Sequence, residues 1–405
     1  MRRKASRNGS RTWPRTMPTM LRSRRSSTSS ERTPSDSQQI GIVMGAFAIG
    51  LLLSRAWLSH LADQRGRKIV LLIGMSAIAL APLGYLMIQS LPIMMAIRAF
   101  HGISIAAFAT AYSALVVDLS PPQNRGELIG YMSLVNPLGL GIGPALGGYL
   151  QADFGYDLLF WVSAGLGLLG LICTMQIQET GTPPRSASLK NGAATKQFWR
   201  LLGTPRIRIP AAILLLVGLM FGTLSTFVPL FMREVGISLN VGLFYTAGAI
   251  ASFSIRLLTG PASDRYGRGR FITLSLMFYG ASMVMLWSAD SASAFLWAGI
   301  AQGAGSGTLI PMMAALMADR SQAHERGVTF GLCMVGFDVG IAIAGPTLGL
   351  VADLVGYRHL FGLSALLALL GIIIFITLSS KDMAHSVRFA LTGGRDIYAL
   401  EPDNP

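Results

Sequence analysis

"LADQRGRK" occupies residues 61–68 and "ASDRYGRGR" occupies residues 262–270. Each is a short charged stretch between two long apolar runs. In both, an Asp is followed three positions later by a Gly and then directly by an Arg: Asp63, Gly66 and Arg67 in the first, and Asp264, Gly267 and Arg268 in the second. A glycine at such a place permits a tight turn. The repetition suggests two copies of one structural unit.

The composition indicates an all-α integral membrane protein. Of the 405 residues, 52% are hydrophobic and 13% are charged, whereas soluble domains carry about 25% charged residues. Apolar runs of 18 or more residues recur, and each is long enough to cross a hydrocarbon core of about 30 Å. We predict eleven spans, at 38–58, 69–89, 92–117, 128–150, 157–178, 207–232, 239–260, 270–288, 293–318, 328–352 and 359–379.

The basic residues predict the orientation of the spans. The net charge is +14, but ten of the 33 Lys and Arg lie in the first 37 positions. Most of the others lie in the loops between the spans, so we expect no nucleic-acid partner. Alternate loops are rich in Lys and Arg, which marks the cytoplasmic side. Both charged stretches, the polar linker 179–206 and the tail 381–405 fall on that side, and we expect the plasma (inner) membrane.

The chain repeats itself at an offset of 201 residues. The matched pairs are Gln39 and Asn240, Gly41 and Gly242, Arg55 and Arg256, Gly102 and Gly303, Asp118 and Asp319, and, with one extra residue, Gly143–Pro144 and Gly345–Pro346. We therefore predict two parallel bundles, 38–178 and 207–380. Two such halves around a shared site are typical of transporters that expose the site to alternate sides.

The charged stretches resemble the loop signature of the major facilitator superfamily, G-x-L-A-D-R-x-G-R-K. The first copy departs from it at Ser59 and Gln64, and the second has Ala262 in place of Leu. The resemblance covers residues 38–380. It implies two pseudo-symmetric bundles with twelve helices, of which this chain shows eleven. It also implies a monomeric transporter driven by the proton gradient, with a small-molecule substrate and the lipid bilayer as partners.

The same resemblance predicts a cytoplasmic gate. In the family, such acid–base–acid clusters are held to latch the halves in the outward-open state. Here the gate would comprise Asp63, Gly66, Arg67 and Asp118 in one half and Asp264, Gly267, Arg268 and Asp319 in the other. The alternative is that these charges only anchor the loops at the lipid headgroups.

The expected first helix is missing. The repeat places residues 8–31 opposite the span 209–232, but that window contains five arginines, each costing about 2.5–3.5 kcal/mol near a helix centre. Our hypothesis is that residues 1–37 are a gene-model artefact over the true first helix. The alternative is a genuine, disordered basic extension.

Three residues are candidates for proton or substrate coupling: Asp338, Arg98 and His101. Asp338 lies deep in an apolar span, where a carboxylate is costly and is a functional hypothesis by default; the alternative is a neutral Asp bonded to a neighbouring helix. Arg98 and His101 resemble part of the family signature R-x-x-Q-G-x-G, whose Arg is associated with proton coupling. Arg98 could also reach the outer interface, and His101 could be a packed, hydrogen-bonded histidine.

"GLGIGPALGG" (139–148) resembles the family's fifth-helix signature, which is associated with antiporters. We predict that Gly139, Gly143, Gly147 and Gly148 let a neighbouring helix approach closely and that Pro144 adds a kink. The aromatic residues Tyr112, Phe221 and Phe227 are candidates for a cavity lining, although aromatic residues on helices more often serve packing.

These features predict a proton-coupled exporter of drugs or metabolites. The alternatives are an importer or facilitator of sugars or organic acids on the same fold, and a truncated membrane protein without transport. An enzyme is not expected, because no nucleophile–base set is present. Neither a cofactor nor a metal site is expected, and Cys173 and Cys333 fall inside apolar runs.

Overall fold

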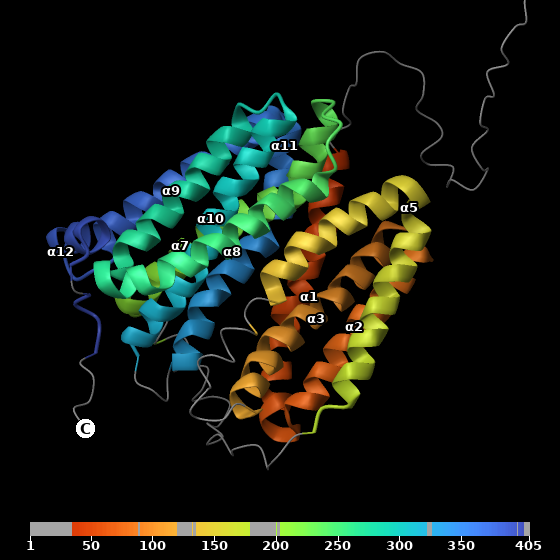
Figure 1. Ribbon diagram of the computed structural model, residues 1–405, viewed down its shortest axis with the longest axis horizontal. Coiled ribbons are helices and arrows are strands. Elements are labelled where there is room, and N and C mark those ends of the chain that lie inside the picture. The colour runs from red at the N-terminus through yellow and green to blue at the C-terminus, as the bar shows by residue number, and fades with distance from the viewer. Residues whose placement is uncertain are drawn as a thin grey trace, which may run out of the picture. The chain divides into compact units, whose positions relative to one another are not determined.

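The computed structural model describes residues 35–87, 90–119, 132, 135–178, 200, 203–321, 326–394 and 396–400. Within these residues, nine helices are long and apolar enough to cross a membrane (Figure 1). They are α1 (Ser35–Arg65), α2 (Arg67–Leu86), α3 (Leu91–Leu119), α5 (Val135–Met175), α7 (Pro205–Glu234), α8 (Val241–Tyr266), α9 (Arg268–Trp287), α10 (Ala292–Asp319) and α11 (Arg326–Leu378). The short helices α12 (Met383–Val387) and η2 (Arg388–Thr392) follow.

Two of the nine helices each contain two spans. The backbone leaves the helical conformation at Gly155 in α5 (φ 86°) and at Gly356 in α11 (φ 80°), a region that favours glycine. With these two breaks, the described residues contain the eleven spans predicted from the sequence. The all-α membrane fold is confirmed. Residues 1–34 of the predicted segment 1–37, and with them the missing-helix hypothesis, lie outside the described residues, whereas residues 35–37 already belong to α1.

The first residues of several helices suit a helix start, where backbone N–H groups have no partner within the helix. The side chain of Asn240 accepts a hydrogen bond from the N–H of Gly242 (2.8 Å) at the start of α8. Ser291 does the same for Ala294 (3.3 Å) at the start of α10. Pro205 opens α7, where its missing N–H costs no hydrogen bond.

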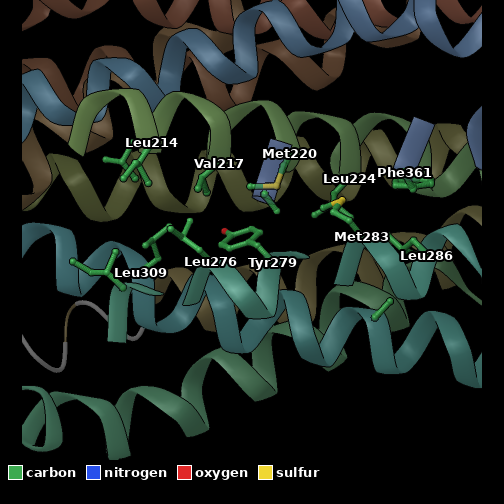
Figure 2. Close-up of a cluster of buried hydrophobic side chains, with 14 of the residues drawn as sticks. Leu214, Val217, Met220, Leu224, Leu276, Tyr279, Met283, Leu286, Leu309 and Phe361 are labelled. Carbon is green, nitrogen blue, oxygen red and sulfur yellow. The ribbon is translucent and has the colours of Figure 1, made fainter. Parts of the chain in front are cut away.

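The buried side chains form two separate cores. One contains residues of α1, α2 and α3, among them Leu58, Ala107 and Ala111. The larger core lies in the second half of the chain, where Figure 2 shows α7 facing α9. The facing residues follow one stripe on each helix: Leu214, Val217, Met220 and Leu224 on α7, and Leu276, Tyr279, Met283 and Leu286 on α9. In a bilayer, this close packing rather than escape from water holds helices together.

Helix α7 is the central helix of the second half. Of its span, 72% is buried inside the protein, against 22% for the span of α3. In the internal repeat, the counterpart of α7 is residues 8–31, which are not among the described residues.

The repeat is visible in the packing within each half. A Cβ on Gly102 of α3 would collide with the carbonyl oxygen of Phe47 on α1, and a Cβ on Gly303 of α10 would collide with that of Gly248 on α8. These two close approaches are equivalent at the offset of 201 residues.

Candidate functional site

Within the described residues, the two halves meet at two glycine-mediated joints. In the first, Gly41 of α1 touches Gly345 of α11, and a side chain on either glycine would collide with the backbone of the other. A Cβ on Gly45 would lie 2.7 Å from Cγ of Pro346. We call this contact the α1–α11 joint.

The second joint has the same design. Gly242 of α8 packs directly on the backbone of Pro144 and Ala145 in α5. Thr246 of α8 donates a hydrogen bond to the carbonyl oxygen of Gly141 (2.5 Å), and Asn240 donates one to that of Ala145 (3.4 Å). This α5–α8 joint is the counterpart of the first, because Gly41 matches Gly242 and the Gly-Pro pairs match each other in the repeat.

Part of the predicted helix-packing set is wrong. Nothing lies within 4 Å of where a Cβ would stand on Gly139 or Gly143, and a Cβ on Gly147 would meet only the side chain of Leu159, at an ordinary 3.5 Å. Gly148 does make a close approach, to Asn240. The other close glycine is Gly141, which the family signature leaves unspecified and whose Cβ would lie 2.9 Å from that of Ala249.

An ion pair also joins the halves. Arg55 of α1 pairs with Asp338 of α11. Their side chains are 27% and 11% exposed, so the pair is largely withdrawn from solvent. Asp338 lies twelve residues after the start of α11, which is about 18 Å along the helix. In the repeat, Arg256 corresponds to Arg55, but Pro137 stands opposite Asp338, so of these two matched positions only the one in the second half carries a carboxylate.

Arg98 and His101 form a different cluster inside the first half. The phenol of Tyr85 lies 3.1 Å from Nδ1 of His101, and the guanidinium of Arg98 lies 5.6 Å from the centre of the Tyr85 ring. Arg98 also contacts the sulfur of Met44 at 3.3 Å. Met44 and Arg55 are eleven residues apart on α1, about 16 Å along the helix. The three predicted coupling residues therefore occupy two places rather than one.

The two charged stretches form the turns at one end of the helices, which we call the motif end. Gly66 (φ 95°) and Gly267 (φ 89°) have positive φ angles, a backbone region that favours glycine. Nε of Arg268 lies 3.0 Å from Oδ2 of Asp319, which connects α9 with α10 in the same half. Arg67 donates to the carbonyl oxygen of Ala62 (3.4 Å). The side chains of Asp63, Asp118 and Asp264 are outside what the structure describes.

The aromatic cavity candidates have different environments. Phe227 is fully buried in the larger core and packs on Tyr357, so it is a core residue and not a cavity wall. Phe221 packs on Phe337, and the hydroxyl of Tyr112 donates to the carbonyl oxygen of Met132 (3.2 Å). A groove of about 900 Å³ runs between α9 and α11, with Met277, Trp287 and Leu366 in its walls. All of its wall residues come from these two helices, so it does not lie between the halves.

Sequence reasoning missed the role of Arg55. The signal was present, because an arginine inside an apolar span recurs at the matching position 256. Arg320 lies in the loop between two predicted spans, yet it is fully buried.

Comparison with known proteins agrees with this architecture. The sequence profile of the Major Facilitator Superfamily matches residues 25–260 and 240–394. The staphylopine export protein of Staphylococcus aureus is 25% identical over 343 residues, covering 82% of this chain and 84% of that protein. The multidrug resistance protein MdtG of Serratia proteamaculans is 26% identical over 338 residues, covering 80% and 79%.

A solved structure shares the fold. The nucleoside transporter NupG superposes with a TM-score of 0.69 at 12% sequence identity, covering 85% of this chain and 92% of that one. The matched profile spans most of the chain, and the members of this family are multi-pass membrane transporters of small molecules rather than enzymes. The chain belongs to the Major Facilitator Superfamily.

Proposed function

We propose that the protein is a proton-coupled exporter of small organic molecules in the plasma (inner) membrane. Its halves would be residues 38–178 and 207–380, with the linker 179–206 and the motif end in the cytoplasm. The Lys and Arg of the motif-end loops support this orientation. In that orientation, the two glycine joints would lie toward the outer side of the membrane, away from the motif end.

The observation that carries the proposal is the ion pair between Arg55 and Asp338. A proton that binds the carboxylate of Asp338 removes its negative charge and leaves the guanidinium of Arg55 in a largely buried place without its partner. Removing one member of a buried pair is strongly unfavourable. Protonation would therefore weaken the contact between α1 and α11, and so couple proton binding to the movement of one half against the other.

The direction of transport is supported by the relatives. The staphylopine export protein and MdtG are named for export and for drug resistance. The Gly-Pro signature in α5 also favours an antiporter, and it contributes Pro144 to the α5–α8 joint.

An accumulation assay tests the proposal. Bacteria that lack their own drug exporters would express the chain and be loaded with ethidium or norfloxacin, two fluorescent amphipathic probes. We expect lower accumulation than in cells with an empty vector, and a protonophore should abolish the difference. Export that persists after the gradient collapses would refute proton coupling, and higher accumulation would favour an importer.

Asp338→Asn provides the residue-level test. It keeps the shape of the side chain but removes the charge that Arg55 pairs with, so we expect export to be lost. Asp353→Asn is the matched control, because Asp353 lies on the same helix and does not pair with Arg55. Unchanged export by Asp338→Asn would remove this residue from the mechanism.

A further inference from the structure

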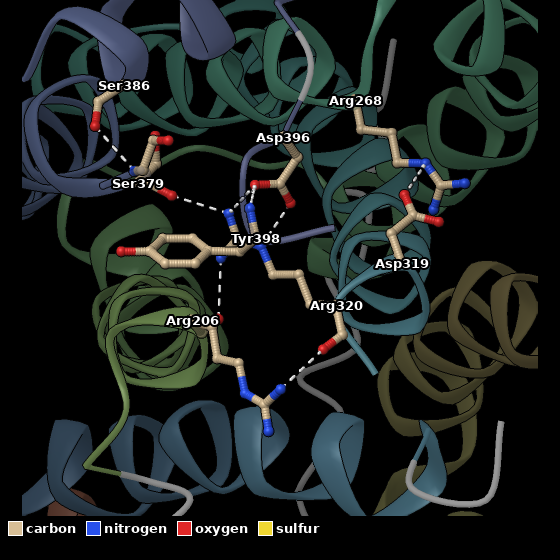
Figure 3. A network of polar contacts seen from close by, with 9 residues as sticks. Arg206, Arg268, Asp319, Arg320, Ser379, Ser386, Asp396 and Tyr398 are labelled. Atoms are coloured by element: carbon tan, nitrogen blue, oxygen red, sulfur yellow. Dashed lines mark hydrogen bonds and ion pairs between the residues drawn. The ribbon is translucent and has the colours of Figure 1, made fainter. Parts of the chain in front are cut away.

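The end of the chain folds back onto the second charged stretch. Residues 379–394 and 396–400 contain α12 and η2, and they contact the motif end of the second half (Figure 3). We call this segment the strap. The sequence predicts only a polar tail here, yet Phe389 and Ala390 are buried.

Arg320 anchors the strap. It is fully buried, which is rare for arginine unless it is paired. Its guanidinium donates to both carboxylate oxygens of Asp396, at 2.6 and 3.0 Å, a bidentate geometry that is among the strongest available. It also donates to the carbonyl oxygens of Arg206 (2.9 Å) and Ser379 (2.9 Å), and it lies 5.1 Å from the centre of the Tyr398 ring.

The strap also contacts the Arg268–Asp319 ion pair, which belongs to the predicted cytoplasmic gate and is called the gate pair below. The backbone N–H of Leu400 donates to the carbonyl oxygen of Asp319 (2.8 Å). Asp319 is the residue whose carboxylate pairs with Arg268, and Arg320 is its neighbour in the chain. Figure 3 shows the Arg268–Asp319 pair beside the Arg320–Asp396 network.

The glycines of the second charged stretch make room for the strap. A Cβ on Gly269 would collide with the carbonyl oxygen of Phe389, and one on Gly267 would lie 2.8 Å from Cα of Gly393. The next residue, Arg270, donates to the carbonyl oxygen of Thr392, and Thr273 donates to that of Ala390 (3.0 Å).

This contact explains a difference between the two charged stretches. The first copy has Lys68 where the second has Gly269, and Leu119 stands at the position that matches Arg320. The second copy therefore departs from the first at the glycine on which the strap lies and at the arginine that anchors it. In the part of the chain that the structure describes, the strap is found at the second half.

We propose that the strap holds the Arg268–Asp319 gate pair in place, with Arg320 and Asp396 as positioning residues. The gating role rests on the proposed transport function, whereas the mechanical link between strap and gate pair does not. The strap fixes the backbone on both sides of the pair, at Gly267–Arg270 and at Asp319–Arg320. Releasing it would loosen the pair and slow the movement that the gate controls.

Hydrogen-exchange mass spectrometry of the purified full-length protein tests the mechanical link. In Arg320→Gln, we expect backbone amides of the strap and of Gly267–Arg270 to exchange about tenfold faster or more, because exchange follows the population of the open form. Lys381→Gln is the control, since it removes an exposed charge from the strap. Faster exchange in the strap alone, or in neither segment, would overturn the proposal.

Two further variants release the strap without removing the buried arginine. Leu400→Pro removes the N–H that bonds to Asp319, and Gly269→Ala places a side chain against Phe389. Both should raise exchange at Gly267–Arg270, even if Arg320→Gln fails to fold. Arg320→Lys, which keeps the charge without the bidentate geometry, should lie between Arg320→Gln and the wild type.

The kinetics of ethidium export distinguish a strap that positions the gate pair from one that only supports the fold. In the strap variants, we expect the maximal rate to fall severalfold while the apparent KM stays unchanged, because the strap does not touch the substrate. A changed KM with an unchanged rate would contradict the positioning role. If the wild type exports no probe, the transport proposal fails, while the exchange data still decide whether the strap holds the gate pair.

Discussion

Gly41 of α1 and Gly345 of α11 meet backbone to backbone, and neither position has room for a side chain. Gly41→Ala should therefore push the two halves apart at this joint. Overpacking of this kind costs about 1–3 kcal/mol, and we expect a lower thermal unfolding temperature together with reduced export of ethidium. Gly242→Ala, at the equivalent joint, should behave in the same way.

Gly139→Ala and Gly143→Ala are the matched controls for these variants. Both glycines belong to the family signature, but nothing lies within 4 Å of where their Cβ atoms would stand. Stability and export should both be retained. If these two variants proved as harmful as Gly41→Ala, the signature rather than the observed contact would identify the important glycines.

The Arg55–Asp338 pair predicts a coupling between two substitutions. Arg55→Gln and Asp338→Asn each leave one charge without its partner, whereas the double variant leaves neither. We expect the double variant to be more stable than the sum of the single effects implies, by about 0.5–3 kcal/mol. A double-mutant cycle of thermal unfolding measures this coupling free energy. If the two single effects simply add, the ion pair contributes nothing to stability.

The Arg268–Asp319 pair should matter more for transport than for stability. Its side chains are 23% and 37% exposed, and partly exposed ion pairs contribute about 0.2–1 kcal/mol. Arg268→Gln should therefore leave the unfolding temperature nearly unchanged and still alter the rate of export. A large loss of stability with normal export would assign the pair a purely structural role.

Asp382 predicts an acid-sensitive start of α12. Hydrogen bonds from the backbone N–H and the side chain of His385 lower the pKa of Asp382. A depressed carboxyl pKa stabilises the fold above the unfolded value of about 3.9 and ceases to do so as the pH falls through the folded value. A spin label on Met383→Cys, in a variant lacking Cys173 and Cys333, should become more mobile below about pH 4.

The control for this effect is Asp382→Ala, which removes the carboxylate that accepts the hydrogen bond from His385 N–H. It should show a mobile label already at neutral pH and little further change on acidification. A label that loosens equally in both proteins would assign the acid sensitivity to another group.

Phe227 should be important for stability. It is fully buried in the core of the second half, and Phe→Ala changes at such places cost about 3–5 kcal/mol. Leu257→Ala is the control, since its side chain is 64% exposed and faces away from that core. Equal unfolding temperatures for the two variants would contradict the core assignment and restore Phe227 as a cavity candidate.

The spans could be predicted because their signals are local, and the repeat could be predicted because the same residue types recur at one fixed offset. A run of apolar residues specifies a membrane helix without reference to its neighbours, and the turns at Gly66 and Gly267 follow from a glycine between charged residues. The same positions that match at an offset of 201 residues also form matching contacts, such as Gly102 with Phe47 and Gly303 with Gly248.

The site could be predicted only in part because its contacts are tertiary. A glycine pattern says that a helix can be approached closely, but it does not say which face meets a partner, which is why Gly141 was missed and Gly143 was chosen wrongly. Asp338 was recognisable as a buried charge, yet its partner Arg55 lies 283 positions away in the chain. The burial of Arg320 depends on a carboxylate in the tail and has no signal in the neighbouring sequence.

The one-residue breaks at Gly155 and Gly356 have a practical consequence for imaging. Together with the short connections at 235–240 and 288–291, they leave little polypeptide projecting beyond the helices at that face within the described part of the chain. Antibody fragments used as markers in cryo-electron microscopy need a protruding epitope. Fragments that bind the described part of the chain should therefore do so mainly at the face that carries α12.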